Sequence, residues 1–235
     1  AEAGLSPAGR LREQTAGLTQ VKLTADLASR PVNESFEDVI SKLKAIQSFA
    51  ISNRKGLRVA LTCGNESSGD NEIALQQFLS RLPSGSSNVR TTGDQKTYPR
   101  NAKSFFPLPY QVYYSALALP TVPYVDASGA PLQLLAQLLT HKHLHHEIRE
   151  KGGAYGGGAY AQGLGGLFGF YSYRDPNPQN TMKVVGESGV WARDREWTER
   201  DLEEAKLSVF QSLDAPESVS QEGMTRFLSG VDEEM

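Results

Sequence analysis

Five glycines occupy positions within 152–158, directly after a stretch of charged residues and histidines. Residues 130–150 carry leucines and an isoleucine at helical spacing, and residues 155–163 read as a strand. Glycine at such a break lets the backbone turn with positive φ and lets another chain approach closely. The sequence therefore predicts a long helix that ends abruptly and passes into a strand with an unusually bare backbone.

The order of elements around this break is typical of an α+β domain. The pattern predicts a strand at 110–119, a helix at 130–150, a hairpin of strands at 155–163 and 166–173, and helices at 180–193 and 198–213. Thr198 and Asp201 have the spacing of a capping pair. We therefore expect a largely antiparallel sheet with helices packed on one face.

The first 84 residues predict mostly helices. Helical spacing covers about 8–30, 34–50 and 70–82, while residues 57–63 alternate like a strand. The polar run that follows has few apolar anchors and predicts a linker. We expect residues 1–84 to be the end part of one domain, 85–104 to be the linker, and 105–235 to be a second, similar domain that is truncated at its end.

Bulk composition narrows the classes of function. A net charge of -3 gives no basic field for nucleic acid. The apolar runs are shorter than the roughly 20 residues of a membrane-spanning helix. The single cysteine, Cys63, excludes an internal disulfide framework and predicts a buried structural thiol in a reducing compartment. The chain does not begin with Met, and we expect it to be a piece of a longer protein.

All four histidines lie within 141–146 and suggest a metal site. A zinc site needs three or four converging ligands, and only Cys63 or carboxylates could complete one here. The hydrolase motif HExxH is absent, and the inverted motif HxxEH is reversed because Glu147 follows the last histidine. The sequence therefore favours a partly solvated helix face and predicts no metal ligands, with a zinc-binding helix that uses His141 and His145 as an alternative.

Two other patterns, one typical of nucleotide binding and one of acyl transfer, lie around the glycines. Residues 156–161 approximate the dinucleotide-binding pattern GxGxxA, but a helix precedes them and a strand follows, which is the reverse of what that motif requires. Arg149 and Tyr155 offer a permanent cation and a phenolic donor, which suit an oxygen that gains negative charge during acyl transfer. Taken alone, such an Arg more often pairs with helix-end carbonyls, and such a Tyr is usually a packing residue.

Four segments together resemble the presequence protease family of pitrilysin-type zinc metallopeptidases. These are EIREKGGAYGGGA at 147–159, YSYRDPN at 171–177, DLEEAKLSVF with a later DAP within 201–216, and the region 223–228. The likeness is strong from about 105 to 230, and it is looser but in register from about 5 to 82. It covers most of the chain outside the linker.

The resemblance implies a pitrilysin/LuxS-like metallohydrolase fold. Such proteases have four similar α+β domains in two halves that close around an unfolded peptide. The N-terminal half carries the HxxEH zinc site, so zinc is expected there and not in this chain. The C-terminal half contributes an Arg and a Tyr, which match Arg149 and Tyr155 as catalytic residues. The neighbouring positions that the resemblance assigns to peptide binding are Gly152, Gly153, Ala154 and Gly156.

The function implied is the non-zinc-binding part of an ATP-independent peptidase that degrades unstructured peptides such as cleaved mitochondrial presequences. The expected partners are the N-terminal catalytic half and unfolded peptides, with neither nucleic acid nor membrane insertion. The expected location is the mitochondrial matrix, and this piece alone is expected to be inactive. The alternative is a catalytically inactive module of the same fold in a structural or assembly role. For residues 172–175 the sequence predicts a structural turn before Pro176.

Overall fold

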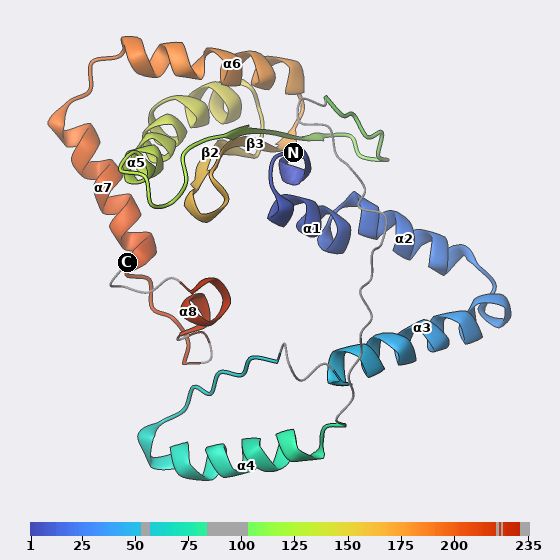
Figure 1. The fold of residues 1–235 in the computed structure, drawn as a ribbon. Coiled ribbons are helices and arrows are strands. Elements are labelled where there is room, and N and C mark those ends of the chain that lie inside the picture. The colour runs from blue at the N-terminus through green and yellow to red at the C-terminus, as the bar shows by residue number, and fades with distance from the viewer. Residues whose placement is uncertain (53–56, 84–102, 220, 222, 231–235) are drawn as a thin grey trace. The chain divides into compact units, whose positions relative to one another are not determined.

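The structure is a computed structural model that describes residues 1–52, 57–83, 103–219, 221 and 223–230. It divides into two compact units (Figure 1). The first unit combines Ala1–Leu23 with Lys96–Ala215, and the second combines Thr24–Gln95 with Pro216–Met235. The candidate site lies in the first unit.

The first unit is built on a three-stranded antiparallel sheet in the order β1-β3-β2. Its strands are β1 (Tyr113–Pro120), β2 (Gly156–Gln162) and β3 (Leu167–Asp175). The strands β2 and β3 form the predicted hairpin through a short 3-10 turn, η5 (Gly163–Gly165). The predicted α+β architecture is confirmed, because one sheet face packs against helices while the other carries exposed tyrosines.

The predicted long helix forms, but its two halves differ. An α-helix, α5 (Gly129–Leu139), continues directly into η4 (Thr140–Lys151), which has π-helical hydrogen bonding. Leu144 and Ile148 of η4 are fully buried. A spacing of four residues places side chains on one face of either helix type, so the hydrophobic pattern could not distinguish the two.

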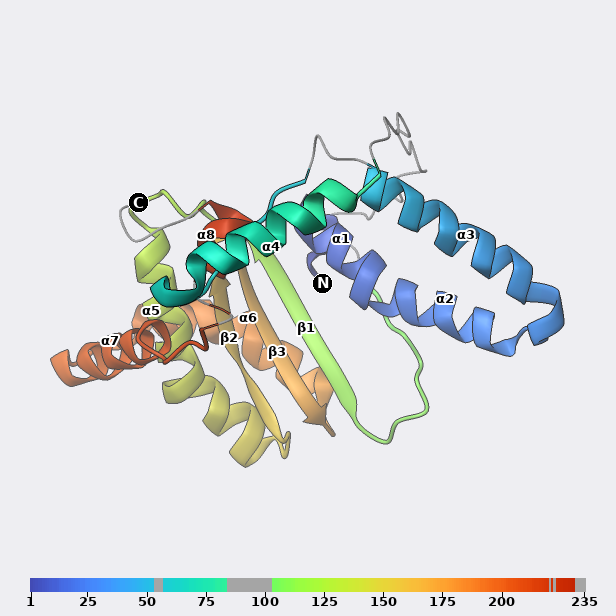
Figure 2. The ribbon, with the colours of Figure 1, turned by 90° about the horizontal axis from the view of Figure 1, so that it is seen from below.

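Helices α6 (Pro178–Asp194) and α7 (Glu199–Leu213) follow the sheet as predicted. In Figure 2, α6 crosses behind the strands, and its Val184 and Val185 join the core that the sheet forms with α5 and η4. The members of this buried cluster are Ala136, Leu139, Leu144, Ile148, Ala154, Phe168, Phe170, Val184 and Val185. Thr198 and Asp201 form a reciprocal capping box at the start of α7, which confirms the capping prediction.

The remaining described segments are mainly helical. The predicted helices are confirmed as α1 (Pro7–Ala16), α2 (Leu18–Ser29), α3 (Val32–Ser52) and α4 (Ser68–Arg81), and shorter elements are η1 (Glu2–Gly4), η3 (Asn65–Ser67) and α8 (Met224–Ser229). The first predicted helix is broken at Gly17. Among the residues described, no helix combines the length and apolarity that crossing a bilayer requires.

The strand predicted at 57–63 is wrong, since these residues have no regular structure. A strand needs a neighbour to satisfy its backbone groups, and no described strand pairs with this segment. Leu57, Val59 and Leu61 are therefore all substantially exposed, and Cys63 is only partly buried rather than a core thiol. Residues 85–102 of the predicted linker lie outside the described residues, so the division into 1–84, 85–104 and 105–235 stays a prediction.

Candidate functional site

Arg149 and Tyr155 lie on opposite sides of the glycine break and line the same concavity. Arg149 is exposed in the last turn of η4. Tyr155 immediately precedes β2 and is 69% exposed. The concavity is shallow and largely open to solvent, has a volume of about 770 Å³, and is also lined by Glu150, Gly153, Ala154 and Arg174. The structure therefore brings together the two residues that sequence reasoning proposed as catalytic.

The turn between them is fixed by two glycines and by backbone hydrogen bonds. A Cβ on Gly152 would lie 2.5 Å from the carbonyl oxygen of Ile148, and Gly153 has φ +78°. The Gly153 N–H donates to the Arg149 carbonyl at 3.0 Å, and the Ala154 N–H donates to the Ile148 carbonyl at 3.1 Å. These bonds satisfy the last carbonyls of the helix, as a left-handed C-terminal glycine commonly does. Gly152 and Gly153 thus have a structural role that accounts for their presence.

The next residues differ in how far packing explains them. The Ala154 side chain is 3% exposed and belongs to the core. A Cβ on Gly157 would lie 2.8 Å from Cγ2 of Ile148, so close helix–strand packing requires glycine there, and one on Gly158 would lie 3.1 Å from the Thr140 side chain, which is a tight contact. A Cβ on Gly156 would meet no atom of the described residues within 4 Å. Among the predicted peptide-binding positions, Gly156 is therefore the one at which packing in this structure does not require glycine.

Tyr155 begins a row of exposed aromatic rings. Its ring packs edge-on against that of Tyr173, with the ring centroids 5.8 Å apart. The Tyr173 ring packs in the same way against Tyr114 at a centroid distance of 5.3 Å, and the Tyr114 ring packs against Tyr110 at 5.9 Å. All four tyrosines are at least 43% exposed. The Tyr155 N–H donates to the carbonyls of Tyr173, at 3.1 Å, and Arg174, at 3.3 Å, which fixes the backbone from which the phenol projects. The concavity thus continues into an aromatic surface on the sheet.

The turn predicted at 172–175 is wrong, because these residues form the irregular end of β3, where they pair with β1, and they hold a buried carboxylate. Asp175 is 1% exposed and accepts hydrogen bonds from the hydroxyls of Ser172 (2.8 Å) and Thr181 (2.6 Å) and from the Asn177 N–H (2.8 Å). Arg174, just before it, has φ 50° and lines the concavity. Sequence reasoning did not single out Arg174, and the one signal it offered was an arginine adjoining a turn rich in Asp, Asn and Pro.

The histidines on η4 make contacts with different neighbours. His141 and His145 meet edge-on with ring centroids 5.3 Å apart, and His146 Nδ1 lies 2.7 Å from Glu150 Oε2. In the described part of the chain, no three His, Cys, Asp or Glu side chains are grouped to hold a metal ion. The histidines of η4 therefore have no such set of partners among the described residues.

His143 packs into the protein instead. Its ring stacks on Trp191 with centroids 4.3 Å apart and an interplanar angle of 14°. Its buried Nε2 has no hydrogen-bond partner among the described residues, and burial lowers the pKa of His143. A neutral histidine stacked on an indole is a packing residue rather than a metal ligand.

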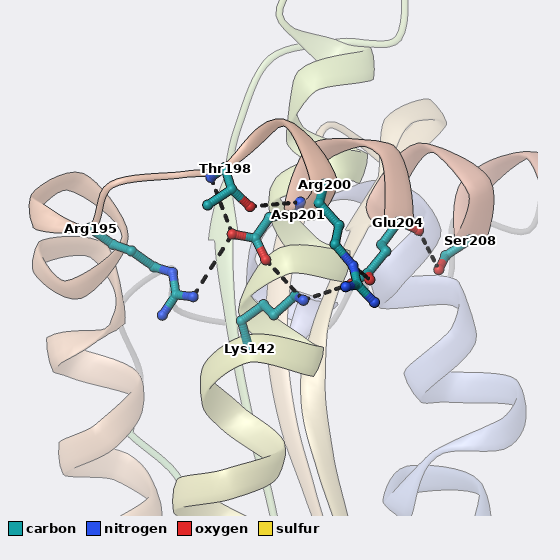
Figure 3. Close-up of polar contacts among 7 residues, drawn as sticks. All are labelled: Lys142, Arg195, Thr198, Arg200, Asp201, Glu204 and Ser208. Carbon is teal, nitrogen blue, oxygen red and sulfur yellow. Dashed lines mark hydrogen bonds and ion pairs between the residues drawn. The ribbon is translucent and has the colours of Figure 1, made fainter.

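A charged cluster joins η4 to α7 (Figure 3). Lys142 Nζ forms ion pairs with Asp201 at 2.9 Å and with Glu204 at 2.7 Å. These hydrogen bonds raise the pKa of Lys142, and the bond from Lys142, together with the capping bonds from Thr198, lowers the pKa of Asp201 to about 2. Because the opposite charges satisfy one another, we interpret the cluster as a structural link between the helices.

Comparison with known proteins decides the family. The family model described as the PreP C-terminal domain matches residues 103–235. The chain belongs to the presequence protease family. Its relatives include proteins named mitochondrial presequence protease from Gibberella zeae, 59% identical over 235 residues, and from Saccharomyces cerevisiae, 38% identical over 234 residues.

These matches cover 100% and 97% of this chain but only 23% and 24% of the respective presequence proteases. The chain therefore spans about a quarter of the length of the relatives it matches. A peptidase M16 inactive domain from Pseudomonas fluorescens also matches, with a TM-score of 0.42 and 22% identity over 68% of this chain and 40% of that one. The family resemblance drawn from the sequence motifs is confirmed.

Proposed function

We propose that this chain is the non-zinc-binding part of an ATP-independent peptidase, in which Arg149 and Tyr155 complete the active site at the scissile peptide bond. One observation carries this proposal. Two side chains that can donate hydrogen bonds project from opposite sides of a fixed glycine turn into a single open concavity. Neither is buried for packing, since Arg149 is exposed and Tyr155 is 69% exposed.

The chemistry suited to this pair is stabilisation of an oxyanion. Water attack on a peptide carbonyl moves negative charge onto its oxygen, and preorganised donors stabilise that charge more than they stabilise the ground state. The Arg149 guanidinium and the Tyr155 hydroxyl would donate to this oxygen. Loss of one such donor typically costs about 2.7–4 kcal/mol of transition-state stabilisation.

The described residues do not form a zinc site, so we assign the metal and the general base to the part of the full-length protein outside this chain. Bound zinc there would supply an activated water. The residues of this chain would act only on the carbonyl oxygen and on the peptide around it. Cleavage would then require the two parts to close on a bound peptide, which makes closure a gate.

The substrates we propose are unfolded peptides, including cleaved presequences in the mitochondrial matrix. The names of the relatives support presequences as substrates and a mitochondrial location. Two features of the structure support peptide substrates. An extended peptide can approach the backbone closely at Gly156, and it can pack against the exposed row of rings from Tyr155 to Tyr110. Gly152, Gly153 and Ala154 stay proposed as backbone contacts of the peptide.

The activity assay compares the purified chain with the full-length protein on a fluorogenic unstructured peptide. We expect zinc-dependent, chelator-sensitive cleavage by the full-length protein without added ATP, and none by this chain alone. Cleavage by the isolated chain would contradict the proposal that the zinc and the general base lie outside this chain. A full-length protein that is inactive with zinc would instead favour the catalytically inactive module.

A further inference from the structure

We propose that Arg174 is a third substrate-binding side chain of this site and that it binds a carboxylate on the peptide. The inference rests on the proposed peptidase function, because it assigns a specificity residue to that same concavity. Arg174 lines the concavity together with Arg149 and Tyr155.

The backbone at Arg174 is the first observation. Tyr113 and Ser115 of β1 pair with Asp175 and Ser172 of β3, so that β3 carries one extra residue in this interval. Such a bulge redirects a side chain, and bulges are frequent next to active sites. Arg174, in this bulge, has φ 50°, and it is the one non-glycine residue with positive φ in the part of the chain that the structure describes. Glycine would adopt this conformation without the steric cost that an arginine bears.

The surroundings of Arg174 hold this conformation in place. The buried Asp175 fixes the next residue through Ser172, Thr181 and the Asn177 N–H. The Arg174 carbonyl accepts a hydrogen bond from the Tyr155 N–H at 3.3 Å. Strained residues that persist because their surroundings fix them are concentrated at ligand sites. A costly conformation that directs an arginine toward the concavity therefore points to a ligand for that arginine.

The charge of the concavity indicates the ligand. Two guanidinium groups, those of Arg149 and Arg174, and one carboxylate, that of Glu150, line it. Glu150 already lies 2.7 Å from His146 Nδ1, and neither arginine forms an ion pair with an acid among the residues described. The Arg174 guanidinium lies 5.9 Å from the centroid of the Tyr173 ring, an arrangement that leaves its fork of donors available. A planar carboxylate matches that fork with two parallel hydrogen bonds.

The test uses the full-length protein and three peptides that differ only in charge. One has a glutamate and an amidated C-terminus, one has glutamine in its place and an amidated C-terminus, and one has glutamine and a free C-terminus. For Arg174→Gln, we expect the preference in kcat/KM for a carboxylate-bearing peptide over the neutral one to fall about tenfold. If the preference falls for the glutamate peptide, the ligand of Arg174 is a side-chain carboxylate. If it falls for the peptide with a free C-terminus, the ligand is the terminal carboxylate.

Arg174→Gly distinguishes binding from structure. We expect it to keep or raise the melting temperature, because glycine relieves the backbone cost, while it loses the same preference. Arg193→Gln, an exposed arginine on α6, serves as the control and should leave the preference unchanged. An unchanged preference in Arg174→Gln, or a melting temperature that falls in Arg174→Gly, would overturn the assignment of Arg174. The proposed function would stand in that case, because it depends on kcat in variants of Arg149 and Tyr155.

Discussion

The Asp175 carboxylate accepts a hydrogen bond of 2.6 Å from the Thr181 hydroxyl and thereby ties the end of β3 to the first turns of α6. The same carboxylate lies close to the N-terminus of α6, where the helix dipole favours a negative charge. Because Arg174 immediately precedes it, the anchor also fixes one wall of the candidate site.

Asp175→Ala should therefore destabilise the chain. The buried Ser172 and Thr181 hydroxyls and the part-buried Asn177 N–H would lose their acceptor, which we expect to cost about 2–4 kcal/mol of unfolding free energy. Urea unfolding followed by the fluorescence of Trp191 and Trp197 measures this change. The control is Asp194→Ala, whose carboxylate is largely exposed at the end of α6. Equal unfolding free energies for the two variants would show that Asp175 is not an anchor.

Two adjacent glycines should respond differently to alanine. Gly157→Ala places a methyl group 2.8 Å from Ile148 and 3.2 Å from the Tyr171 carbonyl, so overpacking should lower stability by about 1–3 kcal/mol. The methyl group of Gly156→Ala would meet none of the described atoms within 4 Å, so stability should be nearly unchanged. If peptide backbone passes close to Gly156, that variant should instead raise KM in the full-length protein. Urea unfolding and steady-state kinetics measure the two effects, and an unchanged KM would remove Gly156 from the peptide path.

The Lys142 cluster predicts a specific loss of stability in acid. Because the folded-state pKa of Asp201 is lowered from 3.8 to about 2, its contribution to stability is present above pH 3.8 and is lost as the pH falls toward 2. Lys142→Met removes the largest cause of this shift, so the dependence of unfolding free energy on pH in this window should become shallower. The bonds from Thr198 should preserve part of it.

Urea titrations between pH 2 and pH 5 measure this slope, with the exposed Lys183 changed to Met as the matched control. A slope that is the same in both variants would show that Lys142 does not set the pKa of Asp201.

Local patterns in the sequence predicted most of the fold. The hairpin, the helices α6 and α7, and the capping box of Thr198 and Asp201 depend on residues close together in the chain, so spacing alone reveals them. The segment 57–63 has equally good alternation, yet it forms no strand, because a strand depends on a partner elsewhere in the chain. Sequence periodicity cannot show whether that partner is present.

The candidate site could likewise be proposed from the sequence only where it depends on residues close together in the chain. Arg149 and Tyr155 could be identified from a motif, and the glycines between them fix the turn locally. Arg174 could not, because its positive φ arises from a bulge against β1 and from the burial of Asp175. An arginine in that conformation is visible only once the strands are paired.

We propose above all that Arg149 and Tyr155 stabilise the transition state of peptide hydrolysis. The most direct measurement is kcat of the full-length protein carrying Tyr155→Phe or Arg149→Ala, on a saturating unstructured peptide. We predict that kcat falls by roughly 10²-fold or more in each variant while the melting temperature is retained, since both side chains are exposed. A near-normal kcat in both variants would contradict the account.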